Sequence, residues 1–120
     1  MKNIYDLHDI WGLLFVFSIE NVHDVAREEI ITSKNVNDDE ELGQLFDLLV
    51  RPEFLFHSPK EQVLLINTLN YFLESGDSFD RVFLNLDTYF DDDVNDRRRF
   101  MRVLLTSLIR YQTESQKSDR

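Results

Sequence analysis

Apolar side chains recur at the spacing of an α-helix through nearly the whole chain, and few residues interrupt the pattern. The clearest stretch places Leu42, Leu45, Phe46 and Leu49 at the i, i+3, i+4 and i+7 positions of one helix face. Only three Gly and two Pro occur in 120 residues, too few for the tight turns of a sandwich or barrel. The sequence therefore predicts an all-α fold, a compact and irregular bundle of five or six helices.

Capping signals and apolar spacing together place the individual helices. The strongest signal is Ser58-Pro59-Lys60-Glu61, a capping box with proline at the first helical position, and Gly76 is expected to end that helix. Residues 51–57 are expected to be a connector in which Phe54-Leu55-Phe56 is either extended or packed on the core. Gly12 lies inside the first helix, where we expect a neighbouring helix to approach over the missing side chain. The expected helices cover about 6–20, 22–33, 38–50, 59–75, 78–90 and 93–111.

One domain accounts for the chain. A length of 120 residues with 42% hydrophobic content is enough to bury a single core. We assign residues 1–112 to one helical domain and expect the polar tail 113–120, which lacks apolar residues, to be disordered. The N-terminus lacks the features of a signal peptide, and the longest apolar stretch, Ile10 to Phe17, is far shorter than the roughly 20 residues that span a bilayer. We expect a cytoplasmic protein without a membrane partner, which agrees with the absence of cysteine.

The chain is strongly acidic, with a formal net charge of −10. Residues 1–96 carry a balance of −15, and residues 97–120 carry +5. An acidic surface repels phosphate backbones, so we predict no nucleic-acid partner. The basic cluster near the C-terminus is expected to offset neighbouring carboxylates; it consists of Arg97, Arg98, Arg99 and Arg102.

The histidines carry an enzymatic alternative. The pairs His8-Asp9 and His23-Asp24 resemble the His-Asp dipeptide of metal-dependent phosphohydrolases, and His57 would be a third ligand. The structural alternative is that all three histidines lie on the surface or beside helix caps.

Other kinds of catalytic or metal site lack their sequence patterns. The Asp91–Asp93 run has neither the glycine nor the glutamate that an EF-hand loop requires. No cysteine, Gly-x-Ser-x-Gly elbow or glycine-rich phosphate loop is present. We therefore predict no catalytic residues, no metal site and no cofactor, and a protein that is not an enzyme.

Two dense acidic patches are the candidate binding residues. Clustered like charges destabilise a fold by self-repulsion, so several clusters favour a role in binding over solubility alone. Carboxylates beside an aromatic side chain suit a basic partner, since charge speeds the encounter and the ring adds affinity. The first patch is Asp38, Asp39, Glu40 and Glu41, and the second contains Asp87, Tyr89, Asp91, Asp92, Asp93 and Asp96.

In size, acidity, helical content and lack of cysteine, and in the stretch from Asn85 to Asp93, the chain resembles bacterial toxin-immunity proteins. This class includes the immunity proteins of contact-dependent growth inhibition. The resemblance implies a cytoplasmic inhibitor that binds a basic toxin domain of the nuclease type. Its carboxylates would take the place of phosphate groups in the toxin's cleft.

A further alternative is a helical adaptor or regulatory subunit that uses an apolar interface. Phe54-Leu55-Phe56 is the place where we expect such an interface. Self-association through it stays open at this point, and an apolar interface would persist at high salt, unlike one built on charge.

Overall fold

The computed structural model describes residues 5–18, 25–84, 86–88, 90 and 93–118. Within them the chain is all-α, with no strand beyond one isolated bridge between Ser18 and Thr88. Since α3, a π-helical turn and α4 follow one another without a break, the described residues form six helical rods, as predicted. The elements are α1 (Leu7–Leu14), a 3-10 turn (Phe15–Phe17), α2 (Val25–Thr32), α3 (Asp39–Leu45), the π-helical turn (Phe46–Val50), α4 (Arg51–Phe56), α5 (Pro59–Glu74), α6 (Asp80–Leu84) and α7 (Arg97–Ser118).

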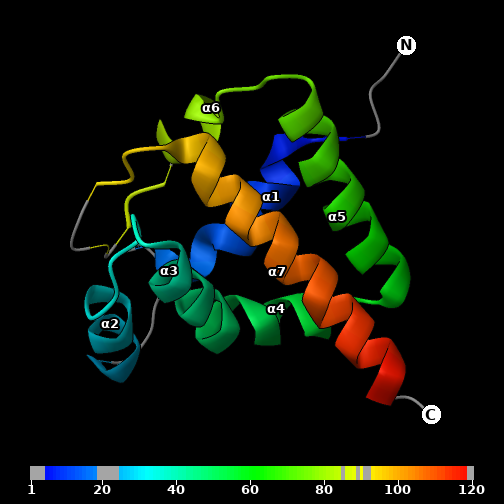
Figure 1. The fold of residues 1–120 in the computed structure, drawn as a ribbon, viewed down its shortest axis with the longest axis horizontal. Helices are drawn as coiled ribbons and strands as arrows, with labels where there is room; N and C mark the ends of the chain where they lie inside the picture. The colour runs from blue at the N-terminus through cyan, green and yellow to red at the C-terminus, as the bar shows by residue number, and fades with distance from the viewer. Residues whose placement is uncertain (1–4, 19–24, 85, 89, 91–92, 119–120) are drawn as a thin grey trace.

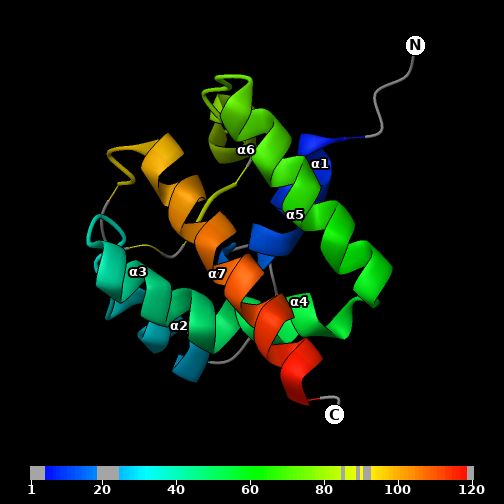
Figure 2. The ribbon, with the colours of Figure 1, turned by 45° about the vertical axis from the view of Figure 1, so that its right-hand side comes forward.

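The long helix α7 organises the bundle (Figure 1). It packs against α3, α4 and α5, while α1 packs against α5 and α6. In both ribbon views α3 and α5 lie on opposite sides of α7, and α5 and α7 run antiparallel (Figures 1 and 2). Among the described residues, no helix has the length and apolar character needed to cross a membrane.

Phe100, near the start of α7, is the centre of an aromatic cluster. Its ring lies 5.3 Å from that of Phe46, 5.2 Å from Phe83 and 5.9 Å from Phe90, measured between centroids. Phe17 completes the cluster through Phe46 and Phe90. Edge-on and tilted ring pairs of this kind add to the hydrophobic gain from burial. The cluster joins α7 to four segments that are far apart in sequence.

The prediction of a connector over residues 51–57 was wrong, because the rod that begins with α3 continues through it as α4. Pro52 has no backbone N–H and would clash with the preceding turn of a regular helix. The π-helical turn lies directly before it, where the Arg51 N–H donates to the Phe46 carbonyl five residues earlier. This wider turn lets the rod pass a proline that would otherwise end it.

The helix expected over 78–90 is much shorter, since α6 covers only Asp80–Leu84. Before it, Phe79 is buried with a φ of 63°, and its N–H donates to the Asp77 carboxylate at 2.7 Å. The expected start of the last helix at residue 93 also moves, because Asp96 caps α7 by accepting from the Arg99 N–H at 3.0 Å. The first helix ends at Leu14, and residues 19–24 lie outside the described part.

At the C-terminus, the expected disorder was wrong for residues 113–118, since α7 continues to Ser118. Tyr111 is buried one turn earlier and fixes the helix against the core. Beyond it the helix continues, and the Thr113 hydroxyl donates to the Ile109 carbonyl.

The predicted boundaries of α5 are confirmed. Ser58 and Glu61 form the capping box, with the Ser58 N–H donating to the Glu61 carboxylate at 2.9 Å. Gly76 follows the helix with a φ of 82°, the left-handed conformation that glycine adopts at low cost. Hydrogen bonds from Ser58 lower the pKa of Glu61, and the backbone of Ser58 has a larger effect than its side chain.

Replacing Ser58 with Ala should lower the free energy of unfolding by about 1 kcal/mol at neutral pH. Because the pKa of Glu61 is lower in the folded state, its ionised form stabilises the fold above the unfolded glutamate pKa of about 4.3. This contribution is lost as pH falls through the folded-state pKa. Urea unfolding between pH 3 and 7 should show an effect of Ser58→Ala that changes little with pH, because alanine keeps the backbone N–H that donates to Glu61. Glu61→Gln should instead give a difference from the parent that shrinks toward acid pH. A Glu61→Gln difference independent of pH would contradict the assigned capping box.

Candidate functional site

The first acidic patch lies at the start of α3, and most of its carboxylates have partners within the chain. Asp38 caps the helix by accepting from the N–H groups of Glu40 and Glu41. Glu41 accepts from the Asn35 N–H at 3.1 Å, and Asp39 pairs with Arg99 at 2.7 Å. Within the described part of the chain, Glu40 alone of the four has no side-chain hydrogen bond or ion pair.

The second acidic patch is described only in part, because Tyr89, Asp91 and Asp92 lie outside the described residues. Asp87 and Asp93 are exposed, and neither side chain has a partner among the described residues. The carboxylate of Asp96 caps α7 and so has a structural role of its own.

The side chain of Asn37 joins the two patches, which lie more than fifty residues apart in sequence. Its amide donates to the Asp93 carbonyl at 2.8 Å, and its carbonyl accepts from the Asn95 N–H at 2.9 Å. The Asp39–Arg99 ion pair connects the same two segments. The patches that the sequence suggested as separate candidates thus form one surface, which we call the joint acidic surface: Asp38–Glu41 with Asp93 and Asp96.

The basic cluster near the start of α7 offsets carboxylates only in part. Arg97 pairs with Asp80 at 2.7 Å, and Arg99 with Asp39. Arg98 instead donates to the carbonyls of Leu73 and Asp77, at and just beyond the end of α5, where a cation is favourable for the helix dipole. Arg102 has no partner among the described residues, and it lines a hollow between α3 and α7.

That hollow also contains a polar network that the sequence analysis missed. Asp47 pairs with Arg110 and accepts from the Tyr111 hydroxyl at 2.5 Å. Burial and, next, the bond to Asp47 raise the pKa of Tyr111 well above its ordinary value, so the phenol stays a neutral donor. The sequence feature that could have indicated this network is an aspartate among the apolar residues 45–50. Its partners, however, lie more than sixty residues away in sequence.

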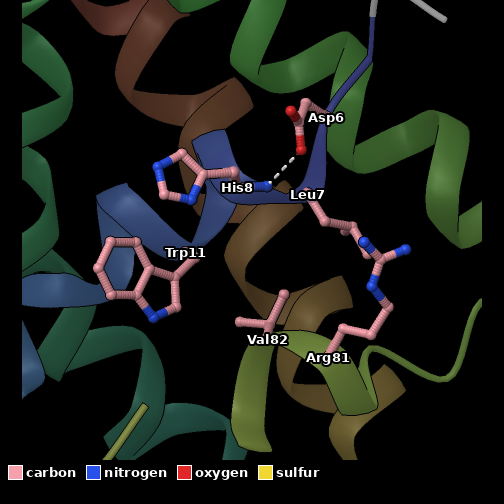
Figure 3. Close-up of a pocket in the computed structure, with 6 residues that line it drawn as sticks. All are labelled: Asp6, Leu7, His8, Trp11, Arg81 and Val82. Carbon is pink, nitrogen blue, oxygen red and sulfur yellow. Dashed lines mark hydrogen bonds between the residues drawn. The ribbon is translucent and has the colours of Figure 1, made fainter. Parts of the chain in front are cut away.

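A second hollow lies between α1 and α6 (Figure 3). The ring of His8 stacks on that of Trp11, with centroids 5.1 Å apart. The backbone N–H of His8 donates to the carboxylate of Asp6, which caps α1. Arg81 extends from α6 toward the start of α1 and borders the opposite side (Figure 3). An aromatic stack and a helix cap explain the position of His8 without any catalytic role.

A third hollow, between α1 and α5, brings three of the candidate metal ligands together: His8, Asp9 and His57. His8, Asp9, His57 and Glu61 all line it. Even so, no three His, Asp or Glu side chains of the described residues are grouped closely enough to hold a metal ion. His23 and Asp24 lie outside the described part. His8 and His57 thus line one hollow, but the described residues do not form a three-ligand group.

The apolar segment proposed for an adaptor has one outward-facing residue. Phe54 is fully buried and Leu55 half-buried, whereas Phe56, at the end of α4, is 89% exposed. A phenylalanine exposed to this degree is costly in water, since burying it would contribute about 2 kcal/mol.

Compared with known protein families, curated proteins and solved structures, the chain matches none of them. Its surface chemistry is therefore the basis for assigning a function.

Replacing Asn37 with Ala should release the 93–95 segment from α3. Loss of two hydrogen bonds at an exposed site should cost about 1 kcal/mol and speed exchange of the Asn95 amide about fivefold. Hydrogen exchange followed by NMR measures this, with Asn70→Ala on the exposed face of α5 as the control. If the Asn95 amide exchanges equally fast in the parent and Asn37→Ala, the two patches are not joined as described.

Proposed function

We propose that this protein is an immunity protein that binds and neutralises a basic toxin domain through its joint acidic surface. The observation that carries the proposal is the Asn37 contact, which unites two acidic segments distant in sequence. A chain with a net charge of −10 would otherwise gain stability by spreading its carboxylates apart. A partner of opposite charge explains why the carboxylates of two distant segments are brought together here.

The carboxylates of the surface divide into two groups with different roles. The carboxylates fixed by a helix cap, an ion pair or a hydrogen bond are Asp38, Asp39, Glu41 and Asp96. Glu40 and Asp93 are exposed and have no partner within the described residues, so they are available to Lys or Arg side chains of a toxin. Fixed neighbours reduce the conformational entropy lost on binding, which favours affinity.

Inhibition by such a surface needs no chemistry from the inhibitor. A nuclease toxin has a basic cleft that binds phosphates, and a carboxylate can accept the same charge-assisted hydrogen bonds from arginine. Long-range attraction raises the association rate, so the inhibitor can capture the toxin before it acts. The protein would accordingly act in the bacterial cytoplasm and would not be an enzyme.

A second candidate function, a helical adaptor, is favoured by the exposure of Phe56. An aromatic side chain that projects from the end of a helix is a typical anchor in a protein–protein interface. Replacing Phe56 with Ser should leave stability nearly unchanged, since the ring is 89% exposed. Sedimentation equilibrium at high salt separates the two functions: an assembly that Phe56→Ser abolishes supports the adaptor, and a monomer in both proteins supports the inhibitor.

The test of the inhibitor is charge reversal on the joint acidic surface. Glu40→Lys with Asp93→Lys should slow association with the protein encoded beside this gene about tenfold and reduce the salt dependence of the rate. Stopped-flow mixing across salt concentrations measures both quantities. The matched control is Glu53→Lys with Glu74→Lys, which changes the net charge equally on exposed positions of α4 and α5. Equal slowing by the two double variants would show that overall charge, and not this surface, guides binding.

A further inference from the structure

Gly12 has no role that the chain itself explains. Its backbone is helical and its φ is not positive, so no turn requires a glycine there. A Cβ atom added at this position would meet no other atom within 4 Å, so the expected close approach of a neighbouring helix was wrong. Glycine inside a helix nevertheless costs about 1 kcal/mol relative to alanine.

The space beside Gly12 is the hollow between α1 and α5. It has a volume of about 370 Å³, within the range of pockets that bind small groups. Leu13, Leu64 and Leu65 supply its apolar lining, and Leu64 remains 40% exposed. A side chain at position 12 would extend into this space. The glycine therefore keeps the hollow open.

The charged groups of the hollow all favour a cation. Asp9 and Glu61 line it together with His8 and His57, and no Lys or Arg is among its lining residues. Asp9 has no side-chain partner among the described residues. Glu61 is held ionised by the capping box, and its other oxygen lies 3.8 Å from Nδ1 of His57. A carboxylate on each helix thus borders an apolar floor.

We propose that this hollow binds an arginine or lysine side chain of a partner protein. Such a side chain has an aliphatic stem that suits the three leucines and a cationic head that suits Asp9 and Glu61. The site lies between α1 and α5, across α7 from α3, and is therefore separate from the joint acidic surface (Figure 1). It does not depend on the proposed inhibitor function.

The other helical glycine, Gly43, lies beside a hollow of a different kind. Gly43 also has no atom within 4 Å of an added Cβ, and it lines the hollow between α3 and α7. That lining mixes both signs of charge and does not select one kind of ligand; it includes Asp39, Glu40, Asp47, Arg99, Arg102 and Arg110. Gly43 instead provides a matched control.

The test uses n-butylguanidinium, which has the stem and head of an arginine side chain. Titration into the isotopically labelled full-length protein, followed by NMR, should give saturable shifts at the amides of Gly12, Leu13 and Leu64. Guanidinium ion at equal ionic strength has the charge without the stem, and it should bind about tenfold more weakly, which corresponds to about 1.4 kcal/mol. Shifts confined to the joint acidic surface, or no saturation at the α1–α5 hollow, would overturn the proposal.

Variants separate binding from folding. Gly12→Ala and Gly43→Ala should both raise the melting temperature, because each replaces glycine in a helix without a clash. Gly12→Leu should fold and weaken n-butylguanidinium binding about tenfold by occupying the hollow, whereas Gly43→Ala should not change binding. Asp9→Asn should weaken binding, and Glu53→Gln, with the same charge change on α4, should not. Unchanged binding in both Gly12→Leu and Asp9→Asn would refute the site, whatever becomes of the inhibitor proposal.

Discussion

Burial of Phe100 is the contact on which the arrangement of the other segments depends. Its ring meets side chains from the π-helical turn, from α6 and from the segment before α7. Removing a buried phenylalanine ring costs about 3–5 kcal/mol, a large share of the stability of a small domain. This cluster therefore fixes α7 against the π-helical turn and α6.

An acidic chain must also limit repulsion among its own carboxylates. The N-termini of helices stabilise part of the negative charge, since Asp6, Asp38 and Asp96 each accept hydrogen bonds from backbone N–H groups there. Arginines of α7 neutralise Asp39, Asp47 and Asp80. The exposed carboxylates that remain lie on several helices, for example Glu28 on α2, Glu53 on α4 and Glu74 on α5.

Local signals in the sequence were sufficient to predict the fold class and the boundaries of α5, because a capping box and a terminal glycine act within a few residues. Segments whose structure depends on distant partners were not predictable in this way. The helix through Pro52 required a π-helical turn, and α6 begins only at Asp80, directly after Phe79 enters the core with a positive φ. The joining of the acidic segments rests on Asn37, whose hydrogen-bond partners lie more than fifty residues away in sequence.

The Asn37 contact has a consequence for how such a surface can change over evolutionary time. Asn37 bonds to backbone atoms of residues 93 and 95, and not to their side chains. Substitutions at these two positions leave the bonds intact, so the pattern of charge can diverge while the loop keeps its place. Mutational drift can thus generate new binding specificities on an unchanged scaffold, whereas an exchange at position 37 loosens the contact that holds the loop.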